Sequence, residues 1–85
     1  MREFEWKIRD EYGIHARPAG ILVKEASRFQ SDILIIKEEK EADGKKLFGV
    51  MGLGVKRDDK ITVRISGTDE ETAETALKKF FEENL

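Results

Sequence analysis

Two hydrophobic periodicities occur in separate segments of this 85-residue chain, and together they restrict the architectures that it can adopt. Apolar residues alternate with polar ones over residues 4–8 and 61–66, which is the pattern of strands with one buried face. In residues 16–26 and 73–81 the apolar residues instead recur every three or four positions, as in helices with one apolar stripe. A chain that holds both kinds of element buries them against each other, so the sequence predicts a two-layer α+β sandwich with helices covering one side of a mostly antiparallel sheet.

The segments between these elements complete the predicted order. Residues 33–36 are four large aliphatic residues, too few for a helix, and they predict a well-buried strand. The charged residues 37–42 predict a turn and a short edge strand, because charge discourages edge-to-edge pairing. Residues 47–54 combine apolar side chains with three glycines, which predicts a short helix ending near Gly54. The expected order is therefore β-α-β-β-α-β-α.

Signals for helix initiation precede both long helices. Pro18 is favoured in a first helical turn, where its missing N–H has no intrahelical partner, so His15 is expected at or next to the N-cap. Thr68 and Glu71 have the spacing of a capping box, which predicts that Thr68 begins the last helix. Gly20, inside the first helix, costs about 1 kcal/mol relative to alanine. It indicates either the close approach of a partner or a weak point in the helix.

Composition excludes several classes of function. Sixteen basic and eighteen acidic residues leave a net charge of −2, so no general attraction to nucleic acid or to an anionic membrane is expected. The chain has no cysteine, the first residues lack the apolar region of a signal peptide, and no apolar run approaches the roughly 18 residues of a membrane span. We expect a single cytoplasmic domain over residues 1–85, with no membrane insertion. Charged residues make up 40% of the chain and only Gln30 and Asn84 carry side-chain amides, which favours a thermophilic source.

The sole histidine, His15, is the candidate functional residue. A phosphoryl group on its ring would meet the free N–H groups and positive end of the helix, together with the Arg17 guanidinium. A lone histidine is more often a surface residue or a satisfied core residue. Gly13, Arg17 and Pro18 each add an independent requirement, namely backbone freedom, anion pairing and helix initiation, and these favour the functional interpretation. One histidine without cysteine provides no N/S ligand set, and carboxylates alone would hold only a weak hard-cation site, so no metal or other cofactor is expected.

Two segments resemble motifs of the histidine-containing phosphocarrier (HPr) family of the bacterial sugar phosphotransferase system. Residues 13–19, Gly-Ile-His-Ala-Arg-Pro-Ala, resemble its phosphorylation-site motif, and residues 46–54 resemble its second helix. Length, element order and the 66–70 entry to the last helix also correspond, so the resemblance spans the chain. It implies an open-faced β-sandwich, in which a four-stranded antiparallel sheet carries three helices on one face.

The resemblance also implies a function for His15. Its Nδ1 would accept a phosphoryl group from phosphorylated Enzyme I and pass it to the IIA domains of sugar permeases. Arg17 would pair with the phosphate, and the backbone amides of Ala16 and Arg17 would bind it. Such a protein is a carrier that acts as substrate and donor for other proteins, not an enzyme.

A partner-binding surface on the first two helices follows from the same resemblance. Its expected members are Gly20, Ile21, Lys24, Ser27, Lys46, Leu47, Phe48 and Met51. Leu47 and Val50 fit an ordinary core equally well, whereas a flexible thioether and an aromatic ring favour surface positions for Met51 and Phe48. Taken alone, Lys24 and Ser27 fit solvated helix positions. A carrier that presents one patch to several partners is expected to be a monomer.

The chain departs from the family pattern at two places. Lys46 stands where many Gram-positive members carry the serine that the HPr kinase phosphorylates, so that regulation is not expected here. Glu38-Glu39 replaces a glycine-containing turn. Two alternatives stay open, a regulatory module that docks to metabolic or transcriptional proteins and a small nucleic-acid module. The acidic balance and the lack of paired aromatics on the middle strands disfavour nucleic-acid binding.

Overall fold

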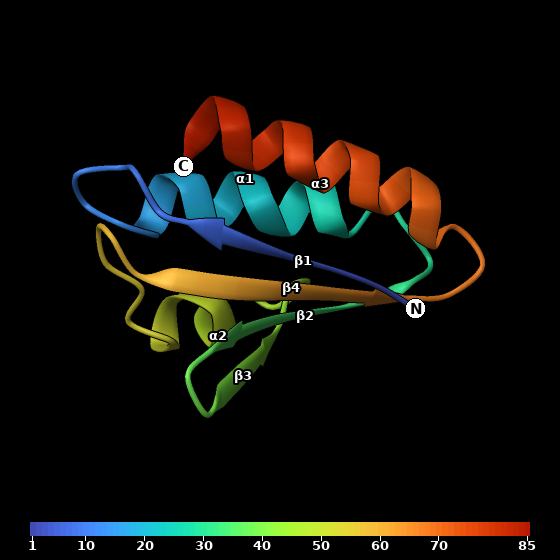
Figure 1. Ribbon diagram of the computed structural model, residues 1–85, viewed down its shortest axis with the longest axis horizontal. Helices are drawn as coiled ribbons and strands as arrows, with labels where there is room; N and C mark the ends of the chain where they lie inside the picture. The colour runs from blue at the N-terminus through green and yellow to red at the C-terminus, as the bar shows by residue number, and fades with distance from the viewer.

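The computed structural model describes residues 1–85 as one sheet with helices packed on one face (Figure 1). The predicted order β-α-β-β-α-β-α is confirmed. The elements are β1 (Arg2–Lys7), α1 (Ala16–Ala26), β2 (Asp32–Lys37), β3 (Lys40–Asp43), α2 (Leu47–Gly52), β4 (Lys60–Ser66) and α3 (Glu70–Asn84). The strands lie in the order β1-β4-β2-β3, and every neighbouring pair is antiparallel.

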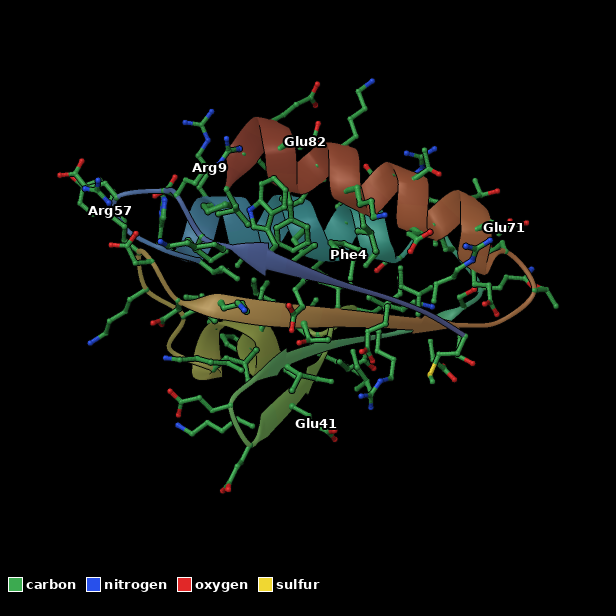
Figure 2. The ribbon with its side chains drawn as sticks, viewed as in Figure 1. Phe4, Arg9, Glu41, Arg57, Glu71 and Glu82 are labelled. Atoms are coloured by element: carbon green, nitrogen blue, oxygen red, sulfur yellow. The ribbon has the colours of Figure 1, made fainter.

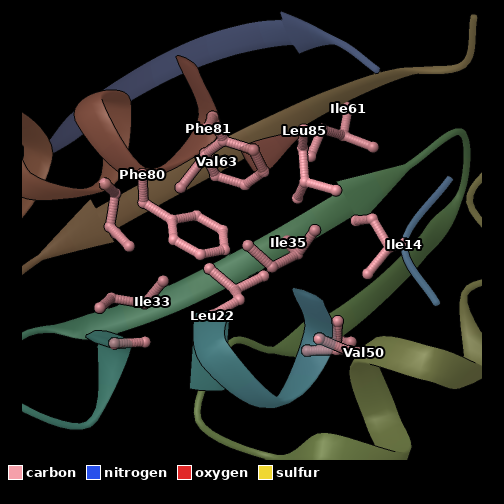
Figure 3. Close-up of a cluster of buried hydrophobic side chains, with 14 of the residues drawn as sticks. Ile14, Leu22, Ile33, Ile35, Val50, Ile61, Val63, Phe80, Phe81 and Leu85 are labelled. Carbon is pink, nitrogen blue, oxygen red and sulfur yellow. The ribbon is translucent and has the colours of Figure 1, made fainter. Parts of the chain in front are cut away.

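The register of the three longer strands aligns their apolar side chains. Val63 of β4 pairs with Phe4 of β1 on one side and with Ile35 of β2 on the other. Because side chains on a strand alternate between faces, residues two positions away join the same face. This row forms the floor of the core, which Figure 3 shows with side chains from β2, β4, α1 and α3.

The helices bury this face of the sheet. Leu22 of α1 and Leu77 and Phe81 of α3 are completely buried, and α1 and α3 contact each other above the sheet (Figure 1). Phe81 also meets the ring of Phe4 edge-on, with ring centroids 6.0 Å apart. The short helix α2 contributes one buried side chain, Val50, and packs beside α1 and β3. None of the helices combines the length and apolar character that crossing a bilayer requires.

Charged side chains cover the outside of this core. Figure 2 shows Arg57 projecting from the loop before β4, Glu41 from β3 and Glu82 from the outer side of α3. Between the neighbouring strands β1 and β4, Glu3 and Arg64 form an ion pair at 2.8 Å on the face of the sheet that the helices leave open. The apolar and charged faces of each element are therefore separated as the sequence periodicity predicts.

The start of α3 differs from the predicted capping box. Asp69, not Thr68, occupies the N-cap, and it makes no side-chain hydrogen bond to the helix. The carboxylate of Glu70 instead accepts a hydrogen bond from the Gly67 N–H at 3.2 Å. The Thr68–Glu71 prediction is wrong because the helix begins one residue later, where the carboxylate of Asp69 contacts the loop between α1 and β2.

The turn between β2 and β3 keeps its hairpin geometry without glycine. Lys37 pairs with Lys40, so Glu38 and Glu39 form a two-residue connection. Glu38 adopts a φ of 55°, in the left-handed region. That conformation costs a non-glycine residue about 1–2 kcal/mol, so the hairpin closes here with a strained turn residue.

Candidate functional site

His15 occupies the N-cap of α1, as the position of Pro18 predicts. Its backbone is extended, with φ −97° and ψ −177°, and its side chain makes no capping hydrogen bond. The first hydrogen bond of the helix runs from the Ala19 N–H to the His15 carbonyl at 2.9 Å. The N–H groups of Ala16 and Arg17 precede it, so they have no intrahelical acceptor. The imidazole is therefore attached at the positive end of α1, next to two free donors.

The ring is half-exposed and lies against the loop that precedes it. Its side chain is 42% exposed, and Nε2 lies 3.6 Å from Oδ1 of Asp10. This separation is within ion-pair range and slightly longer than a hydrogen bond. The ring of Tyr12 meets the imidazole edge-on, with centroids 5.7 Å apart. Asp10 and Tyr12 are functional candidates that sequence reasoning missed, because the folding of the loop, and not a local pattern, brings Asp10 to the ring.

The backbone of this loop is fixed against the segment before β4. The Gly13 N–H donates to the Asp10 carbonyl at 3.0 Å, and the Ile14 N–H donates to the Val55 carbonyl at 3.1 Å. Gly13 has a φ of 68°, and a Cβ atom there would lie 2.2 Å from the Val55 oxygen. Glycine is thus required at position 13 for two reasons. Its φ is in the left-handed region, and the Val55 backbone leaves no room for a Cβ atom.

The half-buried Lys37 in turn holds the segment before β4, against which the His15 loop packs. Lys37 Nζ lies 3.0 Å from the Asp59 carboxylate and donates to the Gly54 carbonyl at 2.9 Å. The Lys56 N–H and then the Lys37 ammonium hold the pKa of Asp59 below its ordinary value. Backbone hydrogen bonds join Ile8 to Asp59 and Asp58, which connects this segment to the end of β1. The two loops that fix His15 are consequently tied to the sheet.

Arg17 stands beside His15 at the mouth of a shallow depression. The hollow has a volume of about 250 Å³ and is lined by Asp10, His15, Arg17, Pro18, Ile21 and Asn84. Arg17 is exposed and takes part in none of the ion pairs of the chain. The structure therefore brings the two predicted residues together, with a cation free to meet an anion.

The expected partner residues lie on two adjacent helices. Phe48 is 86% exposed, whereas Val50, two residues along the same short helix, is fully buried. Ile21, Leu47 and Met51 are each about two-fifths exposed, and Ile21 also lines the depression beside His15. The remaining expected members, Lys24, Ser27 and Lys46, are exposed, and Gly20 is half-buried. The structure thus assigns Val50 to the core and leaves Leu47 on the surface.

Known proteins are similar to this chain in sequence and fold. The family described as "PTS HPr component phosphorylation site" matches residues 2–83. The chain is 42% identical to the phosphocarrier protein HPr of Mycoplasma genitalium over 85 residues, 99% of this chain and 97% of that protein. Its structure matches a Mycoplasma histidine-containing phosphocarrier protein with a TM-score of 0.94 at 39% identity, covering 96% and 93% of the two chains.

HPr from Thermoanaerobacter tengcongensis is also similar, with a TM-score of 0.92 at 38% identity over 96% of this chain and 92% of that one. A second structure of that protein, described as a dimer, has a TM-score of 0.78 at 37% identity and covers 98% and 95%. These matches define a phosphocarrier of the phosphotransferase system. The chain belongs to the HPr family.

Proposed function

We propose that this chain carries a phosphoryl group on Nδ1 of His15, accepting it from phosphorylated Enzyme I and passing it to the IIA domains of sugar permeases. The observation that carries the proposal is the half-exposed imidazole at the N-cap of α1, beside Arg17. Nε2 is the nitrogen next to Asp10, which leaves Nδ1 as the nitrogen without a carboxylate neighbour. The protein acts as a substrate and donor in the cytoplasm, while the enzymes are its partners.

The chemistry needs few groups. The Nδ1 lone pair attacks phosphorus as the bond from phosphorus to the donor breaks, and the reverse step passes the group on. Arg17 pairs with the phosphoryl oxygens, and the N–H groups of Ala16 and Arg17 donate to them. The positive end of α1 stabilises the added negative charge by about 0.3–1 kcal/mol. These interactions hold the group without preventing its transfer.

The same proposal assigns the exposed apolar residues of α1 and α2 to partner binding. Ile21, Leu47, Phe48 and Met51 supply the apolar area, with Gly20, Lys24, Ser27 and Lys46 around them. Exposed apolar side chains near a reactive group are typical of an interaction site. The carrier presents this surface as a monomer, which light scattering after size-exclusion chromatography tests; a stable dimer would contradict that part.

Incubation with phosphoenolpyruvate and Enzyme I tests the carrier function. Phosphorus NMR should show one acid-labile phosphohistidine, and the signal should be absent in His15→Ala. Arg17→Ala should slow transfer without lowering the unfolding temperature, because its side chain is exposed and unpaired. Failure to label the wild-type chain with an Enzyme I that labels another HPr would exclude the proposal.

A regulatory docking module is the second candidate, and Lys46 is the observation that favours it. This exposed lysine at the N-cap of α2 offers a cation to acidic partners and has no hydroxyl to phosphorylate. Affinity capture that retains regulators but neither Enzyme I nor IIA proteins would support this candidate over the carrier.

A further inference from the structure

One carboxylate contacts the imidazole of His15. Oδ1 of Asp10 lies 3.6 Å from Nε2, and the same oxygen accepts a hydrogen bond from the Tyr12 N–H at 2.8 Å. The Asp10 N–H donates to the backbone oxygen of Leu85, the last residue of this sequence, at 3.2 Å, and the Asp10 side chain is 26% exposed. Asp10 is therefore held from both its backbone and its side chain, and its orientation toward the ring is set by the fold.

A carboxylate in this place selects between the two forms of a neutral imidazole. One ring nitrogen of neutral histidine carries the proton and the other has the lone pair. An anion beside Nε2 favours the form with the proton on Nε2, which leaves the lone pair on Nδ1. The 3.6 Å separation does not exclude this role, because catalytic contacts in free proteins are often long and shorten in the reacting complex.

The same carboxylate matters more after phosphorylation. When the Nδ1 lone pair forms the P–N bond and the bond to the donor breaks, no proton leaves the ring, so the ring becomes a phosphoimidazolium with its proton on Nε2. On transfer, the P–N electron pair returns to Nδ1 and the ring leaves phosphorus as a neutral imidazole. While the phosphoryl group is attached, the positive ring lies next to the Asp10 carboxylate, and the two charges attract.

No other acidic side chain lines the depression around the ring. Arg17 enters from α1 and carries a positive charge, while α3 contributes Asn84, an uncharged amide that donates to the Phe80 carbonyl. Tyr12 adds an aromatic edge. Among these side chains, Asp10 is the one that can balance a charge on the ring.

We propose that Asp10 is a positioning residue for phosphoryl transfer at His15, which keeps the proton on Nε2 and balances the charge of the phosphorylated ring. This inference rests on the proposed carrier function and deepens it. It assigns a role to a loop side chain outside the phosphorylation-site motif of residues 13–19.

Asp10→Asn is the variant that isolates the charge. An asparagine Oδ1 still accepts the Tyr12 N–H, so the loop keeps its hydrogen bond. Glu11→Gln is the matched control, because Glu11 is the next residue, is exposed, and loses the same charge without contacting the ring. Nitrogen-15 NMR of the unphosphorylated proteins gives the ratio of the two His15 tautomers, and steady-state assays with Enzyme I give kcat and KM.

We expect Asp10→Asn to lower the ratio of Nε2-protonated to Nδ1-protonated ring about two- to fivefold, the effect of one exposed charge pair. kcat should fall by a similar factor with KM unchanged, and Glu11→Gln should match the wild type in every readout. Equal tautomer ratios and equal kcat values in the three proteins would overturn the proposal. A slower Asp10→Asn with the wild-type tautomer ratio would overturn the role of Asp10 in holding the Nε2 proton and would support its role in balancing the charge of the phosphorylated ring.

The tautomer ratio also separates this inference from the carrier function. It is measured without any phosphoryl donor. If no protein were phosphorylated while the ratio still depended on Asp10, the carrier function would fail and the control of the ring by Asp10 would stand.

Discussion

The carboxylate of Asp69 accepts two hydrogen bonds from Ser31, one from its backbone N–H at 3.0 Å and one from its hydroxyl at 2.5 Å. A third comes from the Gln30 N–H at 2.9 Å. Ser31 is buried in the loop between α1 and β2, whereas Asp69 begins α3. This contact joins two loops that are distant in sequence, and it is the reason why Asp69 does not cap its own helix.

The first prediction concerns the pH dependence of this contact. The Ser31 hydroxyl and then the Gln30 N–H hold the pKa of Asp69 below its ordinary value of 3.8. A lowered pKa in the folded state means that the contribution to stability is complete above the unfolded value and is lost as pH falls through the folded one. Asp69→Asn should therefore be less stable than the wild type at pH 7, and the gap should narrow below pH 3.8.

Urea unfolding at pH 7 and at pH 2.5 measures that gap. Asp32→Asn is the control, because Asp32 is exposed on β2 and its carboxylate makes no hydrogen bond. It should show no comparable gap at either pH. A deficit of Asp69→Asn that is the same at both pH values would contradict the linkage.

Local patterns predict the elements of this fold, but not the contacts between distant loops. Alternation over residues 61–66 and the stripe over 73–81 are properties of neighbouring residues, and both elements form as expected. The start of α3 depends instead on where the loop carrying Ser31 lies after folding. The local signal at Thr68 therefore does not set the start of the helix, because the contact between Ser31 and Asp69 does, and the sequence does not display that contact.

The residues of the site also separate into those that a local motif predicts and those that depend on tertiary folding. His15 and Arg17 follow from a local motif, because Pro18 sets the start of α1. The proximity of Asp10 to the ring depends on the loop folding back against Val55, which no local pattern predicts. The sequence also leaves open whether Leu47 or Val50 is buried, since the pattern of a single short helix does not reveal which side meets the sheet.

The second prediction compares two glycines with similar backbone angles. Gly13 and Gly54 have φ values of 68° and 65°, but only at Gly13 would a Cβ meet backbone atoms, the nearest being the Val55 oxygen at 2.2 Å. Gly54→Ala should cost about 1–2 kcal/mol for its conformation alone. Gly13→Ala should cost at least about 2 kcal/mol more, because the loop that carries His15 must move away.

Urea unfolding of both variants gives the difference, and a HSQC spectrum reports whether the His15 resonance shifts. The shift should be confined to Gly13→Ala. Equal losses of stability would show that conformation alone accounts for both, and that the close approach to Val55 has no energetic effect.

The third prediction concerns Gly20 of α1. No atom outside its own helix lies within 4 Å of the position of an added Cβ. Gly20→Ala should therefore raise the free energy of unfolding by about 0.5–1 kcal/mol, the usual penalty of glycine within a helix. An increase in KM with Enzyme I alongside this gain would show that a partner uses the open space; a loss of stability would contradict the helix argument.

The last prediction separates packing from recognition on α2. Val50 is completely buried, so Val50→Ala should lower the free energy of unfolding by about 2 kcal/mol through lost apolar burial and a residual cavity. Phe48 is 86% exposed, and Phe48→Ala should change stability by less than about 0.5 kcal/mol. Its effect should fall on partner binding, because an exposed aromatic ring in an apolar surface is typical of a binding hot spot, and KM with Enzyme I should rise about tenfold. Urea unfolding and steady-state transfer assays on the same preparations test both halves of this prediction. If Phe48→Ala left KM unchanged while Val50→Ala raised it, α2 would support recognition through its packing, and the exposed ring of Phe48 would have no part in it.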